Sequence, residues 1–198
     1  MTRIVAGAAK GRRLKVPRGD KVRPTTDRVK EAVFSSLQSR LVGAVVLDLY
    51  AGSGGLGLEA ASRGAARVVM VERDRRALEA LRRNVDTVGL STVVVVAGDV
   101  ERVVAQAHGE SFGRLFDIVL ADPPYDLDAD TLAEVLSSTV PLIGPDGVVV
   151  VERSTRSGPL DWPEGLVAEA SRRYGDTTVH RARRAGRGDT ENHRVDKA

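Results

Sequence analysis

The sequence predicts a doubly wound α/β fold, and three observations support this. Short, mostly β-branched apolar runs recur along the middle of the chain, glycines or acids close them, and segments long enough for crossover helices separate them. Such runs are typical of buried parallel strands, and alternation with helices is typical of a doubly wound sheet. The runs are 45–52, 67–74, 93–99, 116–124 and 147–153, and the helical segments are 57–63, 75–88, 100–107 and 130–139.

A different kind of segment comes before this region. Residues 4–6 and 14–16 flank a glycine-containing turn at 7–11, which predicts a small basic hairpin. Residues 23–41 carry apolar side chains at i, i+4 spacing, which predicts an amphipathic helix. The apolar positions are Val29, Val33, Leu37 and Leu41, and Thr26 or Asp27 is available as the N-cap.

Two further alternating segments, 166–174 and 177–183, follow the last run and predict a closing antiparallel hairpin. Residues 185–198 have almost no apolar content, so we expect them to be disordered. The predicted organisation is an N-terminal extension at 1–40, a main domain at 41–184 and a tail at 185–198.

Composition excludes several classes of protein. The 198 residues include no cysteine and three scattered histidines, so disulfides, thiolate metal sites and cysteine nucleophiles are ruled out, and we expect no metal. The longest apolar stretches fall far short of the ~20 residues of a membrane helix, and the first residues lack the apolar core of a signal peptide. We expect a soluble, cytoplasmic protein that does not bind membranes and is monomeric.

Charge is segregated along the chain, although the net charge is only +3. Residues 1–30 hold ten Lys and Arg against two acids, and residues 172–198 hold eight against four, so the body between them is acidic. Basic ends on an acidic body favour a polyanionic partner over evenly spread solubilising charge. Two solvated tails are the alternative, and charge alone makes them nearly as plausible.

A glycine-rich turn follows the first run, in DLYAGSGGLGLE at 48–59. Gly52, Gly54 and Gly57 satisfy GxGxxG, and Glu72 ends the next run 20 residues after Gly52, which makes a dinucleotide site the first interpretation. However, Asp48 lies four residues before Gly52, where it would repel a pyrophosphate and suit a cationic ligand.

Three acids close three successive runs, namely Asp48, Glu72 and Asp99. For each of them alone, a helix cap or a solvated strand end is the better explanation. Together, beside a glycine turn, they favour S-adenosylmethionine, with its ribose at Glu72, its adenine amine at Asp99 and its cationic end near Asp48.

A second motif, ADPPY at 121–125, closes the fourth run. The two prolines restrict the local backbone, so the Asp122 carboxylate and the Pro123 carbonyl would be held as paired acceptors. Two acceptors on the hydrogens of a base amine would direct its lone pair toward a methyl donor, and Tyr125 would stack the extruded base. A proline-rich turn with a capping Asp is the alternative.

These motifs resemble known proteins. DLYAGSG, VERD, AGD and ADPPY resemble the class I methyltransferases that use S-adenosylmethionine to methylate amino groups. RIVAGAAKGRRL, RPTTDRVKEAVFSSL, GSGGLGLEAASRGA and YGDT resemble the RsmD family of bacterial 16S rRNA guanine-N2 methyltransferases, over about residues 3 to 180.

The resemblance implies a Rossmann-like, seven-stranded, mostly parallel sheet with an antiparallel final hairpin. It also implies S-adenosylmethionine as donor and a guanine N2 of 16S rRNA as acceptor, which we expect within an assembled or partly assembled small ribosomal subunit. Tyr50 and Gly55 depart from the Phe and Ala of the family pattern. The implied cofactor residues are Asp48, Tyr50, Ala51, Gly52, Ser53, Gly54, Glu72, Asp99 and Val100, and the implied catalytic residues are Asp122, Pro123, Pro124 and Tyr125.

The basic N-terminal segment would then neutralise RNA phosphates, with a strongly salt-dependent contribution to binding. Aromatic residues are only 4% of the chain and do not interleave with the cations, so recognition by backbone charge and shape is expected, with one base taken into the DPPY pocket. The candidate RNA-binding residues are Arg12, Arg13, Lys15, Arg23 and Arg28, with Thr25 ranked below them because it can equally cap a helix.

Three other functions compete with this hypothesis. A DNA adenine or cytosine amino-methyltransferase would also use DPPY, but 198 residues leave little room for a target-recognition domain. A nicotinamide-dependent oxidoreductase would use the glycine turn and leave ADPPY without a role. A non-catalytic RNA-binding assembly factor would need neither Asp122 nor Tyr125.

Overall fold

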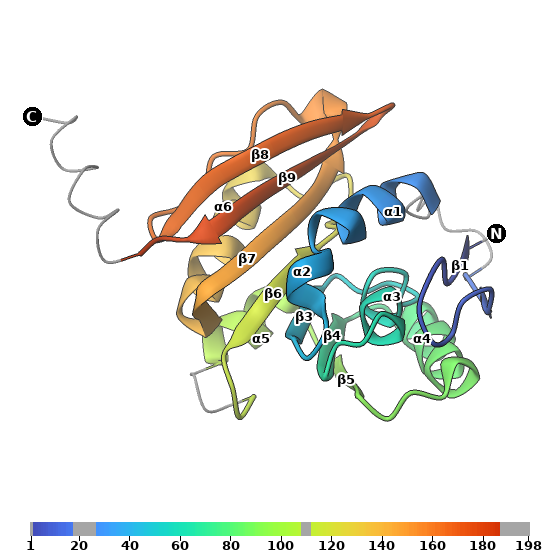
Figure 1. Cartoon of the computed structure of the whole chain (residues 1–198). Helices are drawn as coiled ribbons and strands as arrows, with labels where there is room; N and C mark the ends of the chain where they lie inside the picture. Colours follow the sequence, from blue (N-terminus) through green and yellow to red (C-terminus); the bar gives the residue numbers. More distant parts are fainter. Residues whose placement is uncertain (1, 18–26, 108–111, 187–198) are drawn as a thin grey trace, which may run out of the picture.

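The computed structural model describes residues 2–17, 27–107 and 112–186 (Figure 1). The strands are β1 Thr2–Arg3, β2 Arg13–Leu14, β3 Val45–Leu49, β4 Arg67–Glu72, β5 Val93–Ala97, β6 Phe116–Ala121, β7 Ile143–Ser154, β8 Leu166–Tyr174 and β9 Thr177–Arg184. The helices are α1 Asp27–Ser36, α2 Gln38–Leu41, α3 Gly57–Ser62, α4 Arg75–Val88, α5 Val100–Gln106 and α6 Ala129–Thr139, with short 3-10 turns at Val140–Leu142 and Thr155–Ser157.

In the described ranges, seven strands form one sheet in the order β5-β4-β3-β6-β7-β9-β8. Strands β3 to β7 pair in parallel, whereas β9 pairs antiparallel with both β7 and β8. The predicted doubly wound sheet and its closing hairpin are therefore confirmed. The strand order reverses between β3 and β6, and α/β sheets bind ligands in the crevice at such a switch point.

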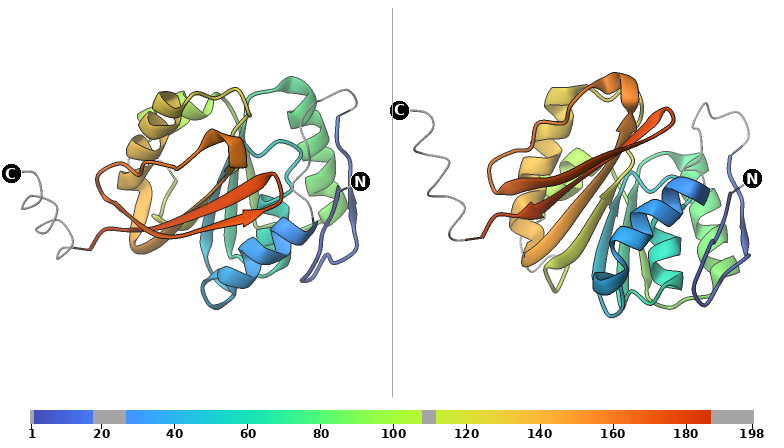
Figure 2. Two further views of the ribbon diagram at one scale, coloured as in Figure 1. Left: turned by 90° about the horizontal axis from the view of Figure 1, so that it is seen from above. Right: turned by 45° about the horizontal axis from the view of Figure 1, so that its top comes forward.

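Helices cover both faces of the sheet (Figure 2). A first core lies between the sheet and α1 to α4 and includes the alternate strand residues Val46, Met70, Leu120 and Val150. A second core lies between the sheet and α5 and α6 and includes Leu47 and Val151. No helix in the described part of the chain is long and apolar enough to cross a membrane.

The predicted helix at 23–41 is corrected in one respect. Its described part is broken into α1 and α2 at Leu37, whose amide donates to the carbonyl of Phe34 at 3.3 Å. This i, i+3 bond tightens the turn between the two helices. Leu37 and Leu41 are both buried in the first core. Residues 23–26 lie outside the described residues, as does the part of the predicted disordered tail at 187–198.

The N-terminal hairpin forms, but its strands are shorter and displaced from the predicted 4–6 and 14–16. The amides of Val5 and Ala6 donate to the two carboxylate oxygens of Glu59 at 2.7 and 3.0 Å, so they cannot extend β1. Likewise, the Lys15 amide donates to the side-chain oxygen of Asn84 on α4, and the Lys15 carbonyl accepts from the side-chain nitrogen of Asn84. Side-chain partners on α3 and α4 therefore replace the expected strand pairing and hold the hairpin against the sheet domain.

Buried polar groups complete this docking. Glu59 is fully buried and also accepts from Arg63 Nε at 2.7 Å, while the Ser62 hydroxyl donates to the Ala6 carbonyl at 2.6 Å. Lys30 on α1 is fully buried, donates to the Arg3 carbonyl and lies 3.5 Å from Asp27. Burial lowers the pKa of Lys30, and the Glu59 carboxylate opposes that effect. The hairpin, α1 and α3 thus share one network and one core.

Candidate active site

A row of four acids closes four neighbouring strands on one face of the sheet. Each acid lies two residues beyond an apolar residue of the first core, and side chains two apart on a strand share a face. The sheet order places β4, β3, β6 and β7 side by side, so the row of acids extends across the switch point between β3 and β6. In this order its members are Glu72, Asp48, Asp122 and Glu152.

Asp48 lies beneath the glycine turn and supports it from inside. Its side chain is 1% exposed, and its Oδ2 accepts from the Gly57 amide at 2.8 Å. Burial raises the pKa of Asp48 to about 8; Asp122 and Glu72 act in the same direction, and the Gly57 amide opposes them. Asp48 therefore orients the turn by direct contact and would influence a cationic ligand through its charge.

Glu72, at the end of the neighbouring strand β4, holds the glycine turn by hydrogen bonds. It is 9% exposed; one oxygen accepts from the Gly52 amide at 2.7 Å, and the other accepts from the amides of Arg73 and Asp74 at 2.7 Å. A carboxylate has about four acceptor positions, so capacity for a hydroxyl remains. Gly52 adopts φ +55°, and a Cβ added there would meet nothing within 4 Å. The turn is thus open above Gly52 and beside Glu72, which suits close approach of a ribose-bearing ligand.

The remaining glycines of the motif are packed from the protein side. A Cβ at Gly54, which has φ +91°, would lie 2.6 Å from Leu81 Cδ1, and one at Gly57 would lie 2.4 Å from Met70 Sδ. The turn is tied down further by the Ala51 amide, which donates to Val71 at 2.9 Å, and by the Ser53 carbonyl, which accepts from Asn84 at 2.8 Å. Of the predicted cofactor residues in this turn, Ala51 and Gly54 are buried, whereas Gly52 and Ser53 are partly exposed.

The ends of β3 and β5 bring a second group of side chains together. Asp99 Oδ2 lies 2.9 Å from an Arg73 guanidinium nitrogen, and the Tyr50 hydroxyl donates to Glu101 Oε1 at 3.3 Å. Hydrogen bonds from Glu101 and Arg73 lower the pKa of Asp99, so it stays an ionised acceptor. Burial, with Glu101 beside it, raises the pKa of Tyr50, whose φ is +60°.

This group modifies two predictions. Tyr50, which replaces the Phe of the family pattern, gains a contact through its hydroxyl that Phe would lack. Val100 buries its side chain in the second core, so only its backbone is available to a ligand at the start of α5. Asp99 lies at the N-cap of α5 and pairs with Arg73, a neighbour that the sequence did not indicate.

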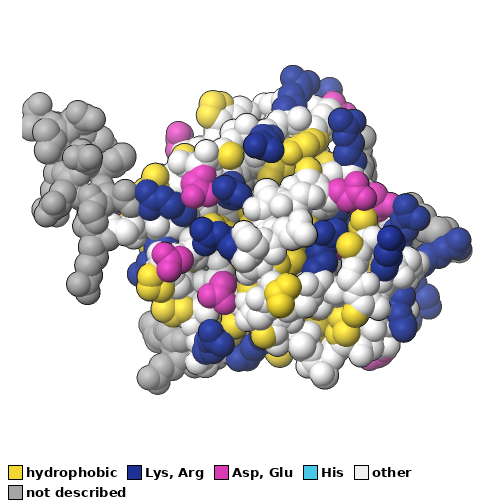
Figure 3. All heavy atoms as spheres, in the orientation of Figure 1, with side chains coloured by type: hydrophobic (Ala, Val, Ile, Leu, Met, Phe, Trp, Pro, Cys, Tyr) yellow, Lys and Arg dark blue, Asp and Glu magenta, His cyan; other side chains and the backbone are white. Residues whose placement is uncertain are grey.

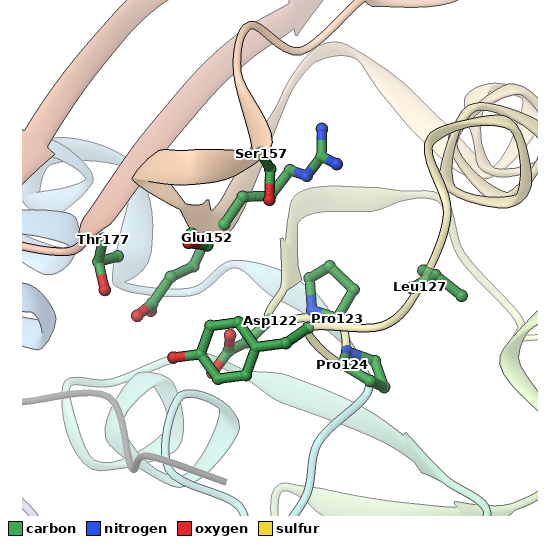
Figure 4. A pocket seen from close by; sticks show the side chains of 10 residues that line it. Asp122, Pro123, Pro124, Leu127, Glu152, Ser157 and Thr177 are labelled. Carbon is green, nitrogen blue, oxygen red and sulfur yellow. The ribbon is translucent and has the colours of Figure 1, made fainter.

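The DPPY motif lines a pocket that is open to solvent (Figure 4). Asp122, Pro123, Pro124 and Tyr125 all contribute to it, and Tyr125 is 62% exposed, which leaves a ring face open for stacking. Sequence reasoning missed the opposite wall, which comes from the end of β7, the following turn and the start of β9. Its residues are Glu152, Arg153, Ser154, Ser157 and Thr177, with Leu127 at the side.

The predicted RNA-binding cations are exposed where the structure describes them. Arg12 donates to the Thr87 carbonyl near the end of α4, Arg13 lies on β2 and Arg28 on α1. Lys15 presents its side chain while its backbone is held by Asn84. Figure 3 shows Lys and Arg side chains along the edge where the hairpin lies in Figure 1. Arg23 and Thr25 lie outside the described residues.

No group of three or more His, Asp or Glu side chains within the described ranges has an arrangement that could hold a metal ion. The site instead offers carboxylates, backbone groups and the rings of Tyr50 and Tyr125.

The comparisons with solved structures define the class of protein. The fold matches a putative methyltransferase, yhhF, from Escherichia coli, with a TM-score of 0.81 and 29% identity, covering 94% of this chain and 99% of that one. It also matches the Thermus hypothetical protein TTHA0928, with a TM-score of 0.76 and 34% identity, over 91% and 98% of the two chains. Fold and site together are those of a Rossmann-like methyltransferase.

The sequence comparisons identify the family. The chain belongs to the family described as Conserved hypothetical protein 95, whose model matches residues 2–183. A putative rRNA methyltransferase of Bacillus subtilis, YlbH, is 35% identical over 178 residues, which are 89% of this chain and 96% of that protein. The ribosomal RNA small subunit methyltransferase D of Escherichia coli K12 is 35% identical over 170 residues, covering 81% and 80%. The resemblance to the RsmD family is thereby confirmed.

Proposed function

We propose that this protein transfers the methyl group of S-adenosylmethionine to the exocyclic N2 of a guanine in 16S rRNA, within the small ribosomal subunit. The observation that carries the proposal is the position of DPPY: it directly follows β6, the strand beside β3 and its glycine turn, at the switch point of a methyltransferase sheet. Family membership favours a methyltransferase over a nicotinamide-dependent oxidoreductase, and the names of the relatives favour rRNA over DNA as the substrate.

The first half of the site fits the cofactor. S-adenosylmethionine supplies an electrophilic methyl group on a cationic sulfur. Glu72 would accept from the ribose hydroxyls at the open side of Gly52, and Asp99 would accept from the adenine amine. The row of acids makes this edge of the sheet favourable for a cation and unfavourable for a pyrophosphate.

The second half of the site would hold the acceptor. The Asp122 carboxylate and the Pro123 carbonyl would accept the two hydrogens of the guanine amine, while Tyr125 stacks on the base. In this arrangement the N2 lone pair faces the methyl group. The N–C bond then forms as the S–C bond breaks, with the sulfur as leaving group, and the surplus N2 proton leaves to solvent after transfer.

The basic N-terminal extension at 1–40 would bind the rRNA backbone. Its hairpin and α1 pack into the core of the sheet domain, so Arg13 and Arg28 would be held in a fixed relation to the pocket. The protein would act as a monomer, because nothing in the proposed site requires a second copy.

Transfer of labelled methyl from S-adenosylmethionine tests the substrate. Small subunits from cells lacking this protein, naked 16S rRNA and DNA should be compared under the same conditions, with Asp122→Ala as the inactive control. We expect the greatest transfer to subunits. Transfer to DNA alone would favour the DNA amino-methyltransferase, whereas tight cofactor binding without transfer to any of them would favour an assembly factor.

A further inference from the structure

We propose that Glu152 determines the specificity of the pocket for guanine by accepting a hydrogen bond from the N1–H of the target base. The assignment rests on the proposed function and deepens it, because it concerns the base that the DPPY pocket admits. Glu152 ends the buried part of β7 and lines the same pocket as Asp122 (Figure 4).

The sheet register fixes the relation between the two acids. Ala121 of β6 pairs with Val151 of β7, so Asp122 and Glu152 come next on neighbouring parallel strands, which run about 4.8 Å apart. Both continue the series of first-core residues and therefore lie on the same face. Glu152 is 8% exposed, so it forms the inner wall of the pocket, whereas Tyr125, at 62% exposed, forms the rim.

On this face the pocket wall beside Glu152 continues with the neutral polar side chains of Ser154 and Thr177. The partner of Glu152 on β9 is Val179, and the β9 cation Arg181 lies two pairs further back, opposite Val150. Arg181 Nε lies 2.8 Å from Glu169, and its guanidinium also donates to the Ser36 carbonyl. These two contacts direct Arg181 toward β8 and α1, and Asp122 and Glu152 supply the carboxylates of the inner wall.

The chemistry of this wall matches one base. Guanine presents adjacent donors at N1–H and N2–H₂, whereas adenine presents an acceptor at N1 and cytosine presents one at N3. An ionised carboxylate only accepts hydrogen bonds. With Asp122 and the Pro123 carbonyl on the amine, Glu152 would pair with N1–H of guanine and would face a lone pair on adenine or cytosine. A site built to bind a donor rejects a base that lacks it, because the buried carboxylate is then left without that bond.

A base analogue separates this role from a structural one. 2,6-Diaminopurine keeps the N2 amine but carries an acceptor at N1. The methylated position is first mapped with the wild-type protein, and 16S rRNA with guanine or 2,6-diaminopurine at that position is then assembled into subunits. Glu152→Gln, whose amide can accept or donate, is compared with Glu134→Gln on the exposed surface of α6 as the matched control.

We expect the wild type and Glu134→Gln to favour guanine by about 100-fold or more in kcat/KM, and Glu152→Gln to favour it by less than about tenfold. Glu152→Asp, which remains an acceptor only, should keep the preference for guanine at a lower rate. An unchanged ratio in Glu152→Gln, with wild-type N2-methylguanosine as product, would overturn the role of Glu152 alone. A different wild-type product would overturn the proposed function and this assignment together.

Discussion

Replacing Gly7 with Ala tests whether the hairpin is held by its fit against α3. Gly7 has φ +84°, and an added Cβ would lie 1.8 Å from the Ser62 carbonyl oxygen and 2.3 Å from its carbon. Backbone atoms cannot rotate away, so the turn must separate from α3. Gly11, in the same turn, has φ +83° and nothing within 4 Å of an added Cβ, which makes Gly11→Ala a matched control.

The structure sets the size of the expected difference. Both variants place a non-glycine residue at positive φ, which costs roughly 1–2 kcal/mol. Gly7→Ala also breaks the bonds from Ala8 to the Ser62 carbonyl at 2.7 Å, from Ala9 to Ser62 Oγ at 2.9 Å and from Ser62 Oγ to Ala6 at 2.6 Å. At about 1 kcal/mol each, this adds about 3 kcal/mol to the loss in unfolding free energy.

Denaturant unfolding measures this difference, and trypsin cleavage at the hairpin cations reports undocking. We expect Gly7→Ala to be cleaved faster and to bind RNA more weakly than Gly11→Ala, with S-adenosylmethionine affinity nearly equal in the two. Equal unfolding free energies and equal cleavage rates would refute the docking contact as the cause.

Four further predictions concern the site and the RNA surface. Asp122→Asn should reduce the single-turnover rate of methyl transfer by about 100-fold or more, while the cofactor affinity measured by calorimetry stays nearly constant. A variant that transfers methyl at the wild-type rate would show that Asp122 does not act on the amine. Glu72→Gln should weaken cofactor binding about tenfold. An unchanged Kd for S-adenosylmethionine would mean that Glu72 does not bind the ribose. A sulfonium cation favours ionised Asp48, so affinity for S-adenosylmethionine should rise with pH up to about 8 in the wild type and stay flat in Asp48→Asn. Because the folded-state pKa of Asp48 is raised, the wild-type unfolding free energy should fall as pH rises from about 4 to about 8, by up to about 1.4 kcal/mol per pH unit. In denaturant titrations over this range, Asp48→Asn should not show this fall. Arg13→Gln and Arg28→Gln should each reduce the magnitude of the slope of log RNA affinity against log salt concentration by about 1. A slope equal to that of the wild type would mean that these arginines do not contact RNA phosphates.

The parallel strands and the doubly wound class could be predicted because buried strands and crossover helices have distinct local patterns. VVLDL and FDIVLA, for example, are mostly apolar runs whose two faces both meet helices. The position of the site followed, since ligands bind where such strands end.

Long-range side-chain partners could not be predicted in the same way. Nothing local to Glu59 or Asn84 indicates that one clamps the amides of Val5 and Ala6 or that the other ties Lys15 to the glycine turn. These contacts join residues more than 30 positions apart, and they decide where the hairpin strands end.

Glu152 is a different case, because a signal was present. It closes its strand two residues after Val150, as Asp122 closes its own two residues after Leu120. The rule that strand-closing residues face the ligand applied to all five runs, and the sequence analysis used it for only the first four.

The central claim is the identity of the modified atom. Nucleosides from subunits treated with this protein and labelled S-adenosylmethionine should be separated and analysed by mass, beside subunits treated with Asp122→Ala. We expect labelled N2-methylguanosine from the subunits treated with the wild-type protein and none from those treated with Asp122→Ala. A labelled methyl group on adenosine, on cytidine or on another atom of guanosine would contradict this expectation.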